Sequence, residues 1–118
     1  MITTDQANYN GLVTYRDGPK GVWRQRTVPV DSFGPNPWGV YQVHGNVWEW
    51  TEDCYKETYA GAPTDGSAWT SGVCGERVVR GGSWYNYPSS VRAATRSGVS
   101  PDARNLDLSF RVARTLAP

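Results

Sequence analysis

The sequence predicts a small, mostly β domain of the α+β class, with much irregular structure and little helix. Its 118 residues are the size of one common domain, so we expect a single domain over residues 1–118. Thirteen Gly and eight Pro are spread along the chain and leave few windows for a long helix. Six Trp and seven Tyr, with a net charge of only +1, provide the aromatic core that disordered chains lack.

The predicted strands are short runs of β-branched and aromatic residues between turn signals. Residues 38–51 alternate most regularly, with Trp48 and Trp50 on one face, and are the best strand candidate. The run 78–80 enters the bend Gly81-Gly82, where the absence of side chains allows close backbone approach. Further short strands are predicted at residues 27–30, 91–95 and 108–113, and the rest of residues 1–37 is expected to be irregular.

Cys54 and Cys74 are the only two cysteines, and they flank a stretch rich in Gly, Pro, Ser and Thr. The pattern fits a loop-closing disulfide or two free buried thiols, whereas two cysteines alone are too few for a closed zinc site. Residues 55–75 are therefore predicted to form a long loop, which a Cys54–Cys74 bond would tie down.

Composition narrows the set of partners. No apolar run approaches the ~20 residues of a membrane span, and residues 1–6 are not a basic segment followed by an apolar one, so we expect a soluble chain without an export signal. From Arg77 onward there are seven arginines and no lysine, against only Asp102 and Asp107. Because the whole chain is nearly neutral, we favour arginines that hold backbone carbonyls over a nucleic-acid surface.

Three motifs, in order and at characteristic spacing, carry a family resemblance: Gly45-Asn46-Val47-Trp48-Glu49-Trp50, Arg80-Gly81-Gly82-Ser83-Trp84 and Phe110-Arg111. Together they resemble the C-terminal half of the formylglycine-generating enzyme (sulfatase-modifying factor) domain. The resemblance implies a variant of the C-type lectin fold. It also implies a minimal or truncated domain without the usual N-terminal half, and an uncovered edge of that kind would favour homo-oligomers.

The catalytic members of that family carry two copper-binding cysteines shortly after the Gly-Gly-Ser motif. Residues 83–92 of this chain contain no cysteine, and neither amides nor hydroxyls replace the soft thiolates that Cu(I) requires. The sequence therefore favours a non-catalytic domain, and no copper is expected.

A calcium site is a second implication of the resemblance, with ligands from Gln42, Gly45, Val47 and Glu49. These would supply the carbonyls of Gly45 and Val47, the Glu49 carboxylate and a side-chain oxygen at position 42. The family usually has Asp or Asn where this chain has Gln42, which is longer and uncharged, so calcium affinity should be weakened or lost. The alternative is that Glu49 accepts hydrogen bonds from backbone N–H groups or from an arginine.

The segment after the Gly-Gly bend has the composition of a recognition surface. Tyr and Trp supply rigid contact area, and Ser and Asn supply adaptable hydrogen bonds. The segment also resembles the variable region of retroelement-diversified proteins, which use the same lectin-like fold. The predicted ligand-binding residues are Trp84, Tyr85, Asn86, Tyr87, Ser89, Ser90, Thr95, Ser97, Val99 and Ser100.

Three functions remain open. The first is a non-catalytic module that binds a protein or a small molecule. The second is an enzyme domain of the family that works with another chain or with the absent half. The third is a structural domain whose core a partner completes.

Overall fold

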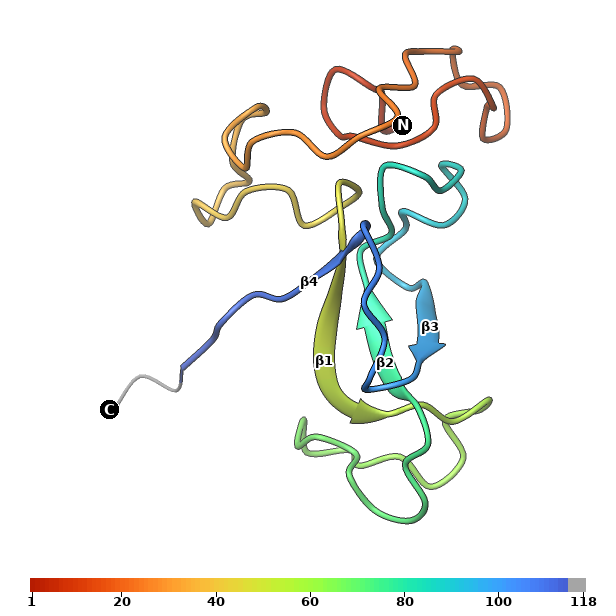
Figure 1. Ribbon diagram of the computed structural model, residues 1–118, viewed down its shortest axis with the longest axis vertical. Helices are drawn as coiled ribbons and strands as arrows, with labels where there is room; N and C mark the ends of the chain where they lie inside the picture. Colours follow the sequence, from red (N-terminus) through yellow and green to blue (C-terminus); the bar gives the residue numbers. More distant parts are fainter. Residues whose placement is uncertain (115–118) are drawn as a thin grey trace.

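The computed structural model describes residues 1–114, which contain four β-strands and no helix (Figure 1). One sheet has the strand order β3-β2-β1-β4, where β2 is antiparallel to β1 and β3, and β4 is parallel to β1. The predicted mostly β, irregular fold is therefore confirmed. The strands are β1 (Trp48–Cys54), β2 (Arg77–Arg80), β3 (Arg96–Val99) and β4 (Leu108–Ser109).

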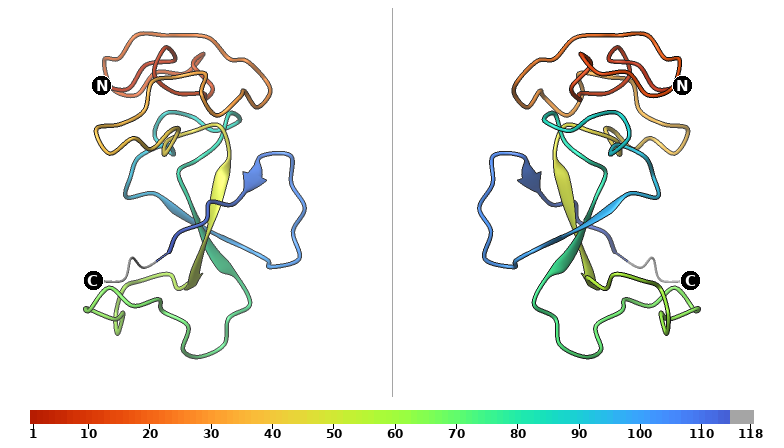
Figure 2. Two further views of the ribbon diagram at one scale, coloured as in Figure 1. Left: turned by 90° about the vertical axis from the view of Figure 1, so that its left-hand side faces the viewer. Right: turned by 90° about the vertical axis from the view of Figure 1, so that its right-hand side faces the viewer.

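The sheet separates two irregular regions (Figures 1 and 2). The chain before β1 lies at one end of the sheet, together with the connection between β2 and β3. The loop between β1 and β2 lies at the opposite end, and the chain leaves the sheet after β4. Over residues 1–114 there is no helix of the length and apolar character that a membrane crossing requires.

A disulfide between Cys54 and Cys74 closes the β1–β2 loop, as the cysteine spacing allowed. Arg96 of β3 fastens the same loop from the sheet, because its guanidinium donates to the carbonyls of residues 56 and 57. The guanidinium also lies over the rings of Tyr55 and Tyr59, at 5.0 and 4.4 Å from their centres. The loop is thus fastened by a covalent bond and by cations of the sheet, since Arg80 of β2 also donates to the Tyr59 hydroxyl.

Two buried amides hold the irregular N-terminal region against the sheet. Asn8 Nδ2 donates to Asn46 Oδ1 over 3.0 Å and to the Arg26 carbonyl over 2.8 Å. Asn46 also accepts from the Val28 N–H and donates to the Val28 carbonyl, at 2.9 and 3.1 Å. The predicted strand at 27–30 is wrong, because this side chain gives Val28 both hydrogen bonds that a neighbouring strand would have provided.

The strand predicted at 38–51 begins ten residues later, at Trp48. Asn36 Oδ1 accepts from the N–H groups of Trp38 and Val40, both at 3.0 Å, and so folds this stretch into a turn. Farther on, Gln42 and Asn46 have φ of +45° and +67°, which no extended strand allows. Alternation of side chains was therefore no evidence for an extended backbone before Trp48.

Two other strand boundaries differ from the prediction. Residues 91–95 form turns, in which the Thr95 N–H donates to the Arg92 carbonyl, and the strand begins at Arg96 instead. Val91 is only 2% exposed because it packs in the small apolar core with Ala7 and Tyr9. The strand predicted at 108–113 is confined to Leu108–Ser109.

Candidate ligand-binding site

The bend after β2 requires glycine. Gly81 and Gly82 have φ of +93° and +72°, a region that residues with side chains rarely adopt. A Cβ on Gly82 would lie 2.8 Å from a methyl carbon of Val91 and 2.9 Å from the Ser90 carbonyl oxygen. The bend turns the chain back over the end of the sheet and begins residues 83–90, which we call the recognition loop.

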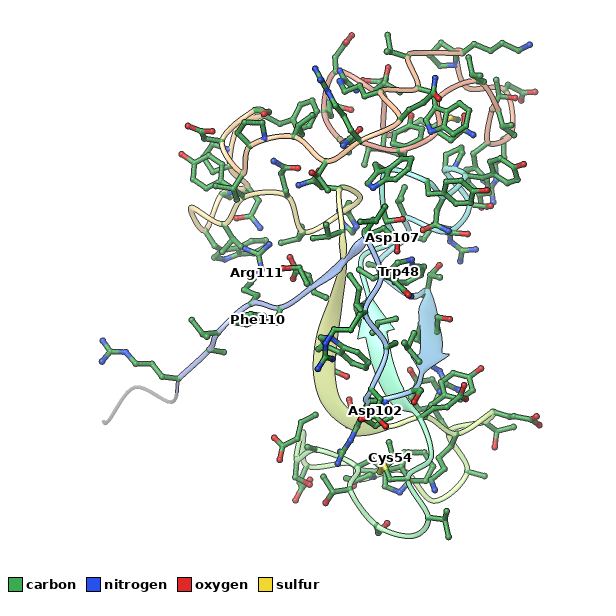
Figure 3. The ribbon with its side chains drawn as sticks, viewed as in Figure 1. Trp48, Cys54, Asp102, Asp107, Phe110 and Arg111 are labelled. Atoms are coloured by element: carbon green, nitrogen blue, oxygen red, sulfur yellow. A yellow bond between two sulfur atoms is a disulfide. The ribbon has the colours of Figure 1, made fainter. Side chains whose placement is uncertain are left out.

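A polar network around the buried side chain of Ser83 holds the recognition loop. The hydroxyl of Ser83, whose side chain is fully buried, lies 2.7 Å from Asn86 Oδ1 and 2.8 Å from Asp107 Oδ2. The backbone N–H of Ser83 also donates to Asn86 Oδ1, over 3.0 Å. Asp107 lies just before β4, at the end of the sheet where this loop begins (Figure 3). The network therefore joins the loop to the segment that enters β4.

The N-terminal region supports the same loop from its other side. The Asn10 N–H donates to the Asn86 carbonyl over 2.9 Å. The indole of Trp23 meets the Tyr85 ring edge-on, with ring centres 6.3 Å apart, and Trp84 does so at 5.6 Å. These aromatic contacts orient Tyr85 while 62% of it stays exposed.

A cavity of about 360 Å³ opens at this junction. One tryptophan, two tyrosines, two asparagines and one serine form its wall, which contains no Asp, Glu, Lys or Arg. Tyr87, like Tyr85, remains largely exposed there. The lining residues are Asn10, Trp23, Tyr85, Asn86, Tyr87 and Ser90.

The ten predicted binding residues fall into two groups. Tyr85, Asn86, Tyr87 and Ser90 line the cavity. Trp84 packs on Tyr85, and Ser89 lies beside Thr95, whose hydroxyl donates to the Ser89 carbonyl. The others follow β3 away from the recognition loop: Ser97 and Val99 lie in the strand, and Ser100 lies just beyond its end.

Two cavity residues, Asn10 and Trp23, were not predicted. They belong to the irregular N-terminal region, and about sixty positions of sequence separate Trp23 from Tyr85. No local pattern marks them, because their place in the cavity depends on how the long irregular segment packs against the recognition loop. The Asn10-Gly11 pair indicates a turn, and Trp23 is a large aromatic residue, but neither feature indicates a place in a binding site.

The four residues of the predicted calcium set make other contacts. Both Glu49 carboxylate oxygens accept from Arg111, at 2.9 and 2.6 Å, and this contact raises the pKa of the Arg111 guanidinium. The Gly45 carbonyl accepts from the Val47 N–H, and Gln42 Nε2 donates to the carbonyls of residues 29 and 30. Calcium prefers about six to eight oxygens with net negative charge. One carboxylate already neutralised by an arginine does not fit that requirement.

The fold is that of a small, mostly β domain of the formylglycine-generating enzyme type, with the loop of residues 83–90 at one end of its sheet. The chain belongs to the formylglycine-generating enzyme family, since residues 3–116 match its sulfatase-modifying factor enzyme 1-like domain. The chain is 40% identical over 104 residues to the mouse formylglycine-generating enzyme, covering 80% of this chain and 26% of the mouse protein. It thus spans about a quarter of that relative.

Two solved structures have the same fold. The structure of PvdO from Pseudomonas aeruginosa superposes with a TM-score of 0.76 at 39% identity, over 92% of this chain and 38% of PvdO. Treponema denticola variable protein 1 superposes with a TM-score of 0.68 at 31% identity, over 91% of this chain and 35% of that protein. The similarity to the variable protein agrees with the predicted resemblance of the segment after Gly82 to the variable region of diversified proteins.

Proposed function

We propose that this domain is a non-catalytic binding module whose recognition loop holds a ligand in the cavity beside Tyr85 and Tyr87. One observation carries the proposal. A hydrogen-bond network around the buried Ser83 fixes the backbone of the loop, while two tyrosines of the same loop remain largely exposed at a cavity. A preorganised backbone with rigid exposed rings is the arrangement that lowers the entropic cost of binding.

The cavity wall favours an uncharged ligand that carries a ring and acceptor oxygens. A buried ionic group would lack a partner of opposite charge there, and that loss is costly. The side-chain oxygens of both cavity amides already accept hydrogen bonds inside the protein. Asn10 Oδ1 accepts from the Leu12 N–H, and Asn86 Oδ1 accepts from the Ser83 N–H. The amide groups therefore offer N–H donors, and the tyrosine rings offer flat apolar faces.

A fragment screen followed by NMR tests the proposal. A library of uncharged ring compounds, with charged analogues of similar size, would be added to the ¹⁵N-labelled protein. We expect the uncharged set to shift the amides of residues 84–90 and the Trp23 indole signal. Tyr87→Ala should weaken such binding at least tenfold, whereas Trp38→Ala, which removes a ring that is 83% exposed elsewhere, should leave binding unchanged. Shifts confined to other surfaces would contradict the proposal.

The similarity to a variable protein supports an extension of this proposal. In it, the sequence of residues 84–109 differs between copies of the gene. Sequencing the codons for residues 84–109 in many clones of the source population tests it, with codons 48–50 as internal control. Variation at positions 85, 87, 89, 97 and 99, with unchanged arginine codons, is expected. A uniform sequence would indicate a module with one fixed ligand.

An enzymatic function is the second candidate, because the mouse relative is a formylglycine-generating enzyme. The recognition loop of this chain has Asn86 and Ser83 in its buried network and no thiol. We therefore expect no formylglycine after incubation of the chain with copper and a cysteine-containing sulfatase peptide. Turnover by this chain alone, detected as the aldehyde by mass spectrometry, would overturn the proposal of a non-catalytic module.

A further inference from the structure

Two arginines lie directly opposite each other in the sheet. Arg80 ends β2, Arg96 begins β3, and the antiparallel register of these neighbouring strands pairs the two residues (Figure 1). Side chains in that position lie on the same face of the sheet, with their Cβ atoms about 5 Å apart, and like charges there destabilise the strand pair. A negative charge close to both guanidinium groups would remove this repulsion.

No carboxylate of the described residues forms an ion pair with these two arginines. Glu49 is the other cross-strand neighbour of Arg80, but both of its carboxylate oxygens accept from Arg111. Asp53 lines the same pocket as the two arginines, but its Oδ1 accepts from a backbone N–H of the β1–β2 loop over 2.7 Å. In the part of the chain that the structure describes, the ion pair of Arg111 is the only one. Arg80 and Arg96 therefore have no ion-pair partner there.

Both arginines line one small pocket between the sheet and the β1–β2 loop. Its volume is about 110 Å³, well below the ~300 Å³ of the smallest pockets that hold drug-sized molecules. Tyr59 of the loop lies against both guanidinium groups. Arg80 Nη2 donates to the tyrosine oxygen over 2.9 Å, and the Arg96 guanidinium lies 4.4 Å from the ring centre. Tyr59 itself is 59% exposed, so solvent ions reach the edge of the pocket.

We propose that this pocket binds a small inorganic oxyanion, such as sulfate or phosphate, between Arg80, Arg96 and the Tyr59 hydroxyl. The lining contains two guanidinium groups and one carboxylate, that of Asp53, so its net charge is +1. An ion with several acceptor oxygens can accept from both arginines at once, and such charge-assisted hydrogen bonds are strong. One bound anion would offset the repulsion within the arginine pair and connect β2, β3 and the β1–β2 loop. The pocket shares no lining residue with the cavity beside the recognition loop, so this inference is independent of the proposed function.

The donors of this site are held in place without the ion. The Nη atoms of Arg80 donate to Tyr59 and to the Ala93 carbonyl. Those of Arg96 donate to two carbonyls of the β1–β2 loop. Each guanidinium group has five N–H groups, and within residues 1–114 no hydrogen bond uses the Nε–H of either arginine. Fixed donors with free N–H groups bind a ligand at a lower entropic cost.

Titration with sodium sulfate tests the proposal, with sodium chloride added to keep the ionic strength constant. The Nε–H signals of Arg80 and Arg96 in the ¹⁵N-labelled protein should shift along saturating curves with one dissociation constant. Sulfate at ten times that constant should raise the melting temperature by about 5 °C. Arg80→Gln and Arg96→Gln should each weaken binding about tenfold or more, and Tyr59→Phe about threefold. Arg104→Gln, which removes an arginine whose only described contact is with the adjacent carbonyl, should bind sulfate like the wild type.

Other results would overturn the proposal. Sulfate stabilises folded proteins in general because it is excluded from their surfaces. A rise in melting temperature that does not saturate and is equal in Arg80→Gln would therefore reflect that effect alone. Arginine signals that do not move with sulfate would show that the pocket holds no oxyanion. Tighter binding of phenyl phosphate than of inorganic phosphate would assign the pocket to a larger ligand.

A second variant serves if Arg80→Gln does not fold. Arg80→Lys keeps the positive charge, but its ammonium group lacks the planar fork of the guanidinium. Sulfate should therefore bind to this variant more weakly than to the wild type. Unchanged affinity would contradict the assignment of Arg80 to the anion.

Discussion

The two loops at opposite ends of the sheet are fastened by different means. The β1–β2 loop, residues 55–76, is closed by the Cys54–Cys74 disulfide and gripped by Arg96 on its carbonyls. The recognition loop has no covalent crosslink and is held by the hydrogen bonds of Ser83 with Asn86 and Asp107. In the first loop, the cysteines and Arg96 are engaged in contacts inside the protein. In the second, buried small polar groups hold the backbone and leave the tyrosines to the solvent.

On the proposed function, this difference would separate stability from recognition. A disulfide and a guanidinium stabilise a loop whose own residues can then be small and polar. A serine, an asparagine and an aspartate fix a loop without occupying its outer surface, so the residues between them can change without loss of the loop's shape. Mutations in the two loops should therefore affect different quantities.

Removal of the disulfide should have the largest effect on stability. For cysteines 20 positions apart, opening the crosslink should lower the free energy of unfolding by about 3 kcal/mol. Urea unfolding of Cys54→Ser/Cys74→Ser, followed by tryptophan fluorescence, measures the loss. The amide signals of residues 84–87 should keep their positions below the transition. Displaced signals there would show that the two loops are coupled and that the comparison fails.

Ser83→Ala should cost about 2 kcal/mol, because a buried hydroxyl bonded to a carboxylate is lost and Asp107 is left with one partner fewer. Its local effect distinguishes it from the disulfide variant. Hydrogen exchange at the amides of residues 85 and 86 should accelerate more than exchange in β1. Ser89→Ala, at an exposed position of the same loop, is the matched control and should change neither quantity.

Only part of the sheet was predictable from local chemistry, since the strand predicted at residues 91–95 is replaced by β3 farther along the chain. Val78 and Val79 are buried and β-branched, and β2 lies within one residue of its predicted limits. The disulfide is one of the two alternatives that two cysteines around a turn-rich stretch left open. The motifs beside β1 and β2 predicted both the fold and the position of the recognition loop.

The irregular half could not be predicted in the same way. There, single side chains replace strands: Asn46 pairs with both backbone groups of Val28, and Asn36 folds the chain that alternation suggested was extended. Such contacts join residues far apart in the sequence, so no local window contains them. The cavity wall formed by Trp23 and Asn10 was missed for the same reason.

Arg96→Ala should lower stability by about 1 kcal/mol, since two hydrogen bonds to carbonyls and two ring contacts are lost at a partly exposed site. Arg96→Lys should recover only part of this, because an ammonium group cannot span both carbonyls. Arg104→Ala is the control for lost charge. Equal melting temperatures for Arg96→Ala and Arg104→Ala would show that the contacts of Arg96 do not stabilise the loop.

Alkaline pH should lower the free energy of unfolding by less than Arg96→Ala does, through Tyr9 in the N-terminal region. Burial, and next the charge of Asp5, raise the pKa of Tyr9 above its ordinary value. The folded state therefore keeps a proton that the unfolded chain releases above about pH 10, so stability is complete below that pH and falls as pH rises toward the folded-state pKa. Urea midpoints between pH 8 and 11 should fall less in Tyr9→Phe than in the wild type; parallel curves would exclude Tyr9 as the cause.

Tyr87→Ala should have the smallest effect on stability and therefore tests the comparison most directly. The residue is 54% exposed, so the free energy of unfolding should change by less than about 0.5 kcal/mol. The same substitution removes a wall of the cavity and should weaken binding of cavity ligands at least tenfold. Urea unfolding beside NMR titration separates the two quantities. A loss of stability as large as that of Ser83→Ala would place Tyr87 in the scaffold, and the exposed ring could then no longer be assigned to recognition.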